Sequence, residues 1–136
     1  MKNYYITDPS NISGNHYLKI FEHFNFIFKD KIKDRFVIAT SGGSDSILLL
    51  YLVCKYFSDY KNKIIIGHIN HNIRDDSIID EEFVKIIGKA LKIKTYVKYL
   101  NPKNKLKNDS LEAWARYERY KHLNLILKET NSQWII

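Results

Sequence analysis

The chain has 136 residues, enough for one domain with a hydrophobic core of its own. Its formal net charge of +7 favours a polyanionic partner such as nucleic acid, although a lysine-rich composition by itself accounts for the charge equally well. The single cysteine, Cys54, excludes a disulfide within the chain, and no apolar run approaches the roughly 20 residues that a membrane-spanning helix requires.

The first two segments of the chain differ in composition. Residues 1–15 are polar and rich in turn-forming residues, so we expect them to be flexible and to contain no secretory signal. Residues 15–30 carry apolar side chains at helical spacing, which predicts an amphipathic helix. These side chains are Tyr17, Leu18, Phe21, Phe24, Ile27 and Phe28. We interpret them as core packing rather than as a surface on which bases stack.

A buried strand is predicted over residues 35–40, followed by a Gly-Gly turn and an apolar helix over residues 44–58. Gly42 and Gly43 allow a sharp turn and leave no Cβ to block a ligand. We expect Ser44 to cap the helix, so that its free N–H groups and the positive end of its dipole face the turn. This arrangement predicts an anion site, and phosphate is the commonest anion for such a site.

Strands and helices alternate through the rest of the chain. The predicted elements are a strand at 61–69, a helix at 76–91, a strand at 94–100, a polar loop at 101–109, a helix at 109–129 and the start of a strand at 133–136. Ile79, Phe83, Ile86, Ile87 and Ala90 are the apolar positions expected on the helix at 76–91. Its charged residues, including Glu81 and Glu82, are expected on a solvated face, and Asp109 with Glu112 fits a capping box for the last helix. The alternation predicts an α/β fold, a doubly wound parallel sheet with helices on both faces, Rossmann-like in architecture.

Asp45 has two interpretations. It can be an acidic residue that stabilises the first turn of the predicted helix, or it can face phosphates through a bound Mg²⁺, because a bare carboxylate would repel them. The sequence HINHNIR contains two histidines, of which His68 lies at the end of the second predicted strand and His71 in the loop that follows it. They do not share a face of the strand, and a zinc site would need further ligands.

The sequence SLEAWARYERY, residues 110–120, places Arg116 and Arg119 on one face of a helix, with Glu112 one turn before Arg116. The spacing fits a Glu–Arg surface pair and equally a pair of guanidinium groups that clamp phosphate. Spacing alone does not decide between these two interpretations.

The loop sequence SGGSDS, residues 41–46, is neither the P-loop of mononucleotide-binding proteins nor the G-x-G-x-x-G fingerprint of dinucleotide-binding folds. It resembles the pyrophosphate loop, or PP-loop, of the N-type ATP pyrophosphatases, which cleave ATP between the α and β phosphates and form an adenylate. This resemblance implies an adenine nucleotide alpha hydrolase-like fold. The sequences HINHNIRDDSIIDEEF and SLEAWARYERY follow this loop in the same order as in the tRNA(Ile)-lysidine synthetases. Over residues 33–136 the chain therefore resembles the N-terminal catalytic domain of that family.

The resemblance to the tRNA(Ile)-lysidine synthetases implies an enzyme that uses ATP and Mg²⁺. Members adenylate the wobble cytidine of isoleucine tRNA with a CAU anticodon, and free L-lysine then displaces AMP to give lysidine. The residues that the resemblance places in contact with the phosphates are Ser41, Gly42, Gly43, Ser44, Asp45 and Ser46. It assigns Asp45 to catalysis and to the metal, Arg116 and Arg119 to stabilising the transferred group, and His71 and Arg74 to the wall of the nucleotide pocket.

The resemblance also sets expectations about the whole protein. The family continues with an A-H-H-x-x-D-x-x-E-T element just where this chain ends, so we expect residues 1–136 to be an incomplete PP-loop ATP pyrophosphatase domain. A homodimer and a longer chain with a missing C-terminal portion both remain open, in the bacterial cytoplasm or in an organelle and not in a membrane. The alternatives are a non-catalytic ATP-binding fragment and another PP-loop enzyme, such as a tRNA thiolase.

Overall fold

The computed structural model describes residue 9 and residues 16–136 of the chain. Its centre is a four-stranded parallel sheet with the strand order β3-β2-β1-β4. The strands are β1 (Phe36–Ala39), β2 (Ile64–Asn70), β3 (Thr95–Tyr99) and β4 (Trp134–Ile135). The helices are α1 (His16–Phe28), η2 (Lys29–Lys31), α2 (Ser44–Tyr56), α3 (Tyr60–Lys63), α4 (Ser77–Leu91), η3 (Pro102–Asn104) and α5 (Leu111–Glu129). Residues 1–8 and 10–15, most of the segment predicted to be flexible, lie outside the described residues.

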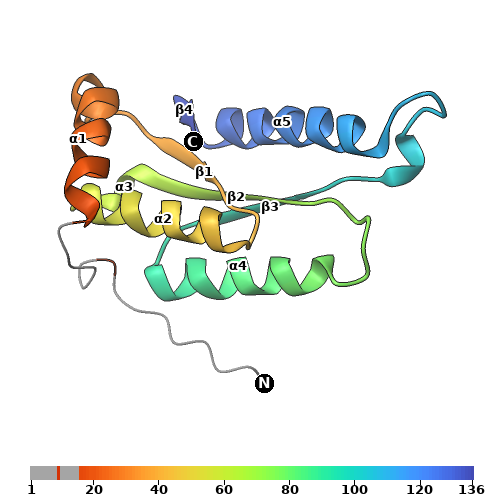
Figure 1. The fold of residues 1–136 in the computed structure, drawn as a ribbon, viewed down its shortest axis with the longest axis horizontal. Coiled ribbons are helices and arrows are strands. Elements are labelled where there is room, and N and C mark those ends of the chain that lie inside the picture. The colour runs from red at the N-terminus through yellow and green to blue at the C-terminus, as the bar shows by residue number, and fades with distance from the viewer. Residues whose placement is uncertain (1–8, 10–15) are drawn as a thin grey trace.

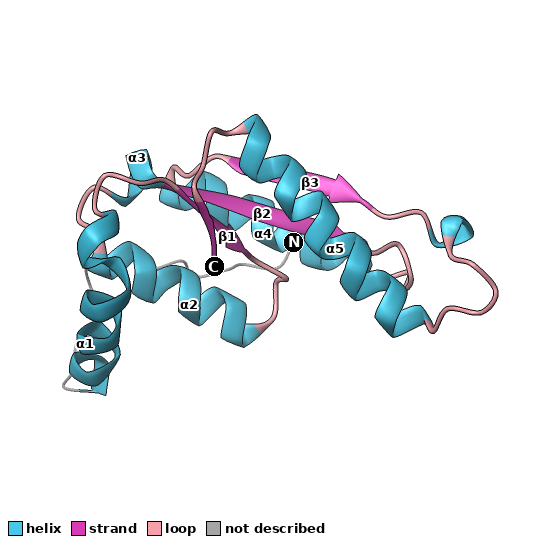
Figure 2. Ribbon diagram, turned by 90° about the horizontal axis from the view of Figure 1, so that it is seen from above, coloured by secondary structure: helices cyan, strands magenta, loops and turns pink. Residues whose placement is uncertain are grey.

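Helices α2 and α4 cover one face of the sheet and α5 covers the other (Figure 1), as the view from above also shows (Figure 2). This arrangement confirms the predicted α/β fold with helices on both faces of a parallel sheet. Within the described residues, no helix combines the length and the apolar character needed to cross a membrane.

Strands β1 and β2 lie in the middle of the sheet, and their apolar runs are covered on both faces. Phe36 of β1 lies opposite Ile64 of β2. Phe36 and Ile38 pack into the cluster formed with α1, α2 and α4, whereas Val37 between them packs against α5. The alternation of side chains along β1 therefore supplies both halves of the core.

Helix α1 contributes aromatic side chains to the core, as its spacing predicted. Phe24 and Phe28 are buried, and the ring centroids of Phe28 and Phe36 lie 5.2 Å apart in an edge-on contact. Leu18 and Ile27, which the same pattern included, are exposed. The core interpretation is therefore confirmed for Phe24 and Phe28, and for Tyr17 and Phe21, which are partly buried against the same cluster, but it is wrong for Leu18 and Ile27.

Both predicted helix caps are displaced by one residue. The N-cap of α2 is Gly43, and Ser44 is the first helical residue, so no side chain caps this helix. The N-cap of α5 is Ser110 rather than Asp109, because the Ser110 hydroxyl accepts a hydrogen bond from the Ala113 N–H at 3.1 Å. The strand predicted over residues 61–69 begins at Ile64, after the short helix α3.

The buried face of α4 differs from the predicted one. The structure buries Glu81, Val84, Ile87, Gly88 and Leu91. Ile79, Ile86 and Ala90 are exposed instead, so three of the five predicted apolar positions do not face the core. The prediction of a solvated Glu81 is also wrong, because a pattern based on apolar residues cannot recognise a buried carboxylate that has its own hydrogen-bond donors.

Candidate active site

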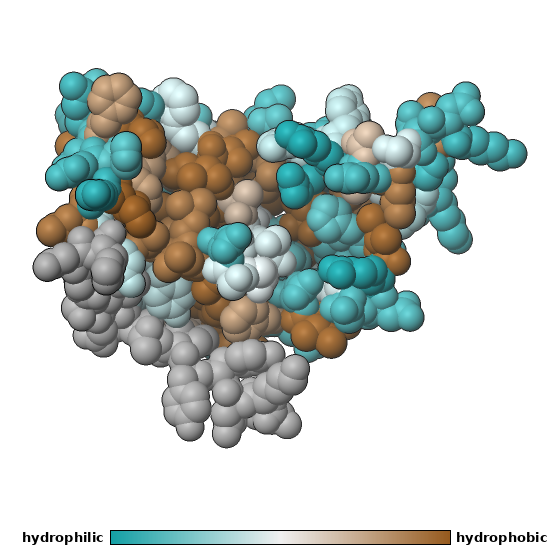
Figure 3. All heavy atoms as spheres, in the orientation of Figure 1, coloured by the Kyte–Doolittle hydropathy of each residue, from teal (hydrophilic) through white to brown (hydrophobic). Residues whose placement is uncertain are grey.

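Two adjoining cavities open at the carboxyl ends of the central strands, where open α/β sheets bind their ligands. The larger has a volume of about 680 Å³ and the smaller about 510 Å³. They share the residues Ser41, Ile69, His71 and Arg119. Figure 3 shows hydrophilic residues gathered on the right of the view, the side on which α4 and α5 begin. The beginnings of α4 and α5, whose residues Ser77 and Glu112 line the larger cavity, lie on this side.

The structure brings most of the predicted site residues to these cavities. Those that line the larger cavity are Ser41, Gly43, His71, Arg74, Arg116 and Arg119. Those that line the smaller cavity are Ser41, Asp45, Ser46, His71 and Arg119. Gly42 and Ser44 line neither of these two, and face an apolar hollow that also contacts Leu48 and Phe83. Segments far apart in the sequence thus converge on one region.

The loop between β1 and α2 has the backbone shape of an anion site. Gly42 has a φ of 96°, in the left-handed region, and a Cβ there would lie 3.2 Å from the Cβ of Asp80. The first bond of α2 runs from the Ile47 N–H to the Gly43 carbonyl at 3.1 Å. The N–H groups at the beginning of the helix therefore have no intrahelical acceptor, and no side chain caps them. They are free to bind an anion.

Two serines hold this loop in shape. The Ser46 hydroxyl donates to the Gly43 carbonyl at 2.9 Å and accepts from the Ser41 N–H at 3.2 Å. The Ser41 hydroxyl lies 3.1 Å from the Ser46 hydroxyl and accepts from the Gly43 N–H at 3.2 Å. These bonds close the loop on itself, so its backbone is already ordered before any ligand binds.

His68 is a buried residue of the larger cavity whose place in the site sequence analysis did not predict. It is 3% exposed, and its Nδ1 lies 2.7 Å from the carbonyl oxygen of Thr40. A carbonyl can only accept, so Nδ1 carries a proton and donates it to Thr40, and Nε2 is the ring nitrogen left for another partner. Nε2 is buried and has no hydrogen-bond partner among the described residues. A polar group on a ligand would satisfy it.

His71 lies between the two cavities and is expected to be neutral. Burial lowers its pKa, and the charges of Arg119, His68 and Arg74 lower it further. Its Nδ1 is also buried and unpaired among the described residues. Arg74, by contrast, is exposed, with its Nε 3.6 Å from Asp76.

Helix α5 presents its two predicted arginines to the cavities. Arg116 lines the larger cavity and Arg119 lines both. In the described part of the chain no ion pair joins Glu112 to Arg116; Glu118 instead lies 3.7 Å from the Lys121 ammonium and 3.6 Å from the ring of His122. The surface pair that sequence spacing allowed is therefore not formed, and the guanidinium carbon of Arg119 lies 5.3 Å from the ring centroid of Tyr120, which lines the smaller cavity.

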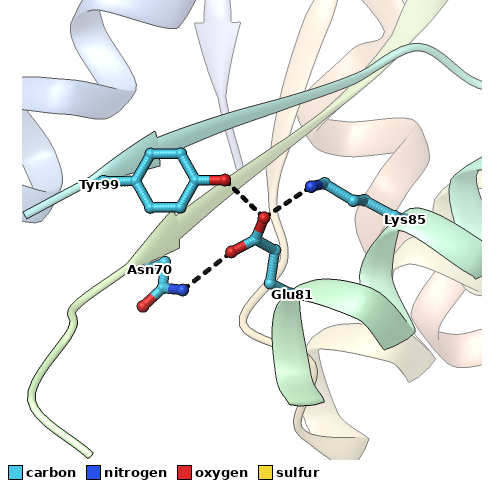
Figure 4. A network of polar contacts seen from close by, with 4 residues as sticks. All are labelled: Asn70, Glu81, Lys85 and Tyr99. Carbon is cyan, nitrogen blue, oxygen red and sulfur yellow. Dashed lines mark hydrogen bonds and ion pairs between the residues drawn. The ribbon is translucent and has the colours of Figure 1, made fainter. Parts of the chain in front are cut away.

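Asn70, which lines the larger cavity, also belongs to a network of polar contacts around Glu81 (Figure 4). The carboxylate of Glu81 on α4 accepts hydrogen bonds from Tyr99 at 2.5 Å, from Lys85 at 2.6 Å and from the Asn70 side chain at 2.9 Å. Burial favours a higher pKa for Glu81, but the three hydrogen bonds outweigh burial and lower the pKa to about 2. Glu81 is therefore charged and fully hydrogen-bonded although it is 1% exposed.

This network makes folding stability depend on pH in a defined direction. The pKa of Glu81 falls from an ordinary value of 4.5 to about 2 on folding, so its contribution is complete above pH 4.5 and is lost as the pH falls toward 2. As the pH falls from 4.5 toward 2, we expect the free energy of unfolding of wild type to fall by on the order of 3 kcal/mol more than that of Glu81→Gln. Denaturant unfolding between pH 2 and 7 measures the difference, with the exposed neighbour in Glu82→Gln as the control. A difference between wild type and Glu81→Gln that stays constant with pH would contradict the assignment.

Comparisons with known proteins identify the family to which this chain is similar. A family model described as a PP-loop domain matches residues 16–136. The tRNA(Ile)-lysidine synthase of Mycoplasma mycoides is 33% identical over 100 residues, which cover 74% of this chain and 24% of that protein. The tRNA(Ile)-lysidine synthase of Thermosipho africanus is 32% identical over 121 residues, which cover 85% of this chain and 27% of that protein. The chain thus spans about a quarter of the length of these curated relatives.

A solved structure has the same fold. The U34-tRNA thiolase NcsA from Methanococcus maripaludis, determined with its 4Fe-4S cluster, superimposes with a TM-score of 0.73. The match covers 92% of this chain and 46% of the thiolase at 18% sequence identity. Similarity at this level of identity concerns the architecture of the sheet and helices alone.

Proposed function

Because the chain belongs to the PP-loop domain family, we propose that its two adjoining cavities bind ATP with Mg²⁺ as part of a tRNA(Ile)-lysidine synthetase. One observation carries this proposal. The β1–α2 loop and the arginines of α5, which are separated by about half of the sequence, meet at the same two cavities, where Arg119 and Ser41 are shared. Free N–H groups on one side and guanidinium groups on the other suit a polyphosphate.

The residues present fit both proposed cofactors. The buried, unpaired Nε2 of His68 can bond a polar group of the base, and Gly43, which lines the larger cavity and has no Cβ, leaves room for phosphate oxygens to approach the backbone. Asp45, which is exposed in the smaller cavity, offers the carboxylate oxygens that Mg²⁺ prefers. When bound, Mg²⁺ would neutralise phosphate charge and polarise the phosphoryl oxygens.

The proposed reaction has two steps. The adenylyl group of ATP is transferred to the wobble cytidine of isoleucine tRNA with release of pyrophosphate, and the amine of free L-lysine then displaces AMP. In the first step Arg116 and Arg119 would stabilise negative charge that develops on the transferred group, and neutral His71 would contact the nucleotide without adding charge. The first step needs the cavities described here together with a bound tRNA.

The test combines the 136-residue chain with ATP labelled at the α phosphate, Mg²⁺ and bulk tRNA, with and without lysine. Label that becomes attached to tRNA and is released as AMP by lysine would support the proposal. ATP binding without transfer of label, in a folded sample, would instead favour a non-catalytic nucleotide-binding fragment. Failure to bind ATP at all would overturn the proposal.

The thiolase alternative is less consistent with the only cysteine. Cys54 lies on α2 and is 2% exposed, and burial raises the pKa of its thiol to about 12. A thiol that stays protonated is a poor nucleophile and a poor ligand for a metal cluster. Sulfur transfer by this residue is therefore not the function that the described residues favour.

A further inference from the structure

The amide of Asn70 has one allowed orientation. Its side chain lies between the Glu81 carboxylate and the backbone of the segment 71–74, which supplies His71 and Arg74 to the larger cavity. A carboxylate can only accept, so the NH₂ group of Asn70 must face Glu81. The Asn70 carbonyl oxygen is then directed to the Asn72 N–H, from which it accepts a hydrogen bond at 2.9 Å.

The turn that follows Asn70 is tied down from its other side as well. Asn72 has a φ of 53°, in the left-handed region, which is an uncommon conformation outside glycine. The side-chain NH₂ of Asn72 donates to the backbone carbonyl of Leu100 at 2.8 Å. The backbone N–H of Leu100 in turn donates to the backbone carbonyl of Asn70 at 2.9 Å. The hydrogen bond that the Asn70 side chain accepts from the Asn72 N–H therefore completes a turn that links the ends of β2 and β3.

We propose that Glu81 is a positioning residue of the ATP site, because its carboxylate fixes the Asn70 amide and thereby holds the segment 71–74 against the larger cavity. The proposal rests on the ATP-binding function proposed above. Glu81 lines neither cavity, whereas Asn70 lines the larger one, so Glu81 acts through Asn70. Tyr99 and Lys85 both donate to Oε1 of Glu81, whereas Asn70 donates to Oε2.

A neutral residue at position 81 would remove this control. In Glu81→Gln the side chain can present either an acceptor or a donor to Asn70, so the Asn70 amide can rotate and lose its bond to the Asn72 N–H. We expect hydrogen exchange of the amides in the segment 71–74 to accelerate about tenfold, because the hydrogen bond from the Asn72 N–H to the Asn70 side chain is lost. We expect the affinity for ATP to fall by about the same factor. Amides of β1 are expected to keep their protection.

Two matched variants separate positioning from a general loss of stability. Glu82→Gln neutralises an exposed carboxylate on the same helix and is expected to leave the exchange of segment 71–74 unchanged. Tyr99→Phe removes one hydrogen bond to Glu81 without touching Asn70, and is expected to leave that segment protected as well. Faster exchange in either control, equal to that of Glu81→Gln, would mean that the network only stabilises the fold.

An exchange of the two partners supplies the rescue. Asn70→Asp alone places two carboxylates against each other and is expected to weaken ATP binding more than Glu81→Gln does. In the double variant Asn70→Asp/Glu81→Gln, the Gln NH₂ can donate to the Asp, whose other oxygen still accepts from Asn72. We expect both protection of the segment and ATP affinity to return to within about threefold of wild type.

The outcomes distinguish the two proposals. Unchanged exchange of segment 71–74 in Glu81→Gln, or no rescue in the double variant, overturns the positioning role whether or not the chain binds ATP. If exchange changes in Glu81→Gln and is rescued in the double variant, but the chain binds no ATP, then Glu81 does hold the segment 71–74 and the proposed ATP-binding function is wrong. The double variant still decides the question where Glu81→Gln alone fails to fold.

Discussion

We expect Asp45→Asn to abolish the contribution of Mg²⁺ to ATP binding, and to reduce AMP formation by about a thousandfold, while the protein stays folded. Asp45 is exposed on the first turn of α2 and lines the smaller cavity beside Ser41 and Ser46. A carboxylate there would repel the phosphates of bound ATP unless a cation lay between them. Several kcal/mol of charge stabilisation at a reacting phosphoryl group corresponds to a rate effect of this size.

The competing interpretation of Asp45 is a helix-stabilising acid, and it predicts a different result. Interaction with the dipole of α2 is worth about 0.3–1 kcal/mol, so its loss would lower the free energy of unfolding slightly without any effect on ligands. Calorimetric titration with a non-hydrolysable ATP analogue, with and without Mg²⁺, measures the coupling directly. Asp30→Asn is the matched control. Asp30 is also an exposed acidic residue in the first turn of a helix, η2, but it lies before β1, whereas Asp45 lies after β1. If the affinity for the ATP analogue depends equally on Mg²⁺ in wild type and in Asp45→Asn, then Asp45 does not bind the metal and only stabilises the helix.

Much of the fold could be predicted because its signals are local. Continuous apolar runs at residues 36–38 and 64–66 marked central strands of a parallel sheet, and the structure covers both on two faces. The helical assignments were also right in type. The errors at Ser44 and Asp109 came from neighbouring residues that can cap a helix almost equally well, and the choice between them is made by backbone geometry.

The site was predictable where its residues lie within motifs and unpredictable where it depends on contacts between distant elements. The motifs placed Asp45 at the beginning of one helix and Arg116 and Arg119 on one face of another, and the structure gathers them at two adjoining cavities. Glu81 was missed because its partners come from two strands as well as its own helix. Its spacing to Val84, Gly88 and Leu91 matches one helix face, but only the three donors explain why a charge can occupy that face.

We expect Arg116→Ala to slow AMP formation by about 100- to 1,000-fold and to change the free energy of unfolding by less than about 1 kcal/mol. Arg116 is exposed and directed to the larger cavity, and among the described residues it forms no ion pair with Glu112 that its removal would break. Labelled AMP formation and denaturant unfolding measure the two effects on the same sample. Lys121→Ala, which removes an exposed cation of α5 outside both cavities, is the control.

Arg116→Lys separates the charge of the side chain from its shape. A lysine keeps the positive charge but cannot offer the planar pair of N–H groups with which a guanidinium binds two phosphate oxygens at once. If Arg116 clamps the transferred group bidentately, Arg116→Lys should recover only a small part of the activity lost in Arg116→Ala. Full recovery would mean that Arg116 supplies only a long-range positive potential. Loss of activity in proportion to loss of thermal stability would instead assign Arg116 to the structure of α5 and leave Arg119, which lines both cavities, as the arginine of the site.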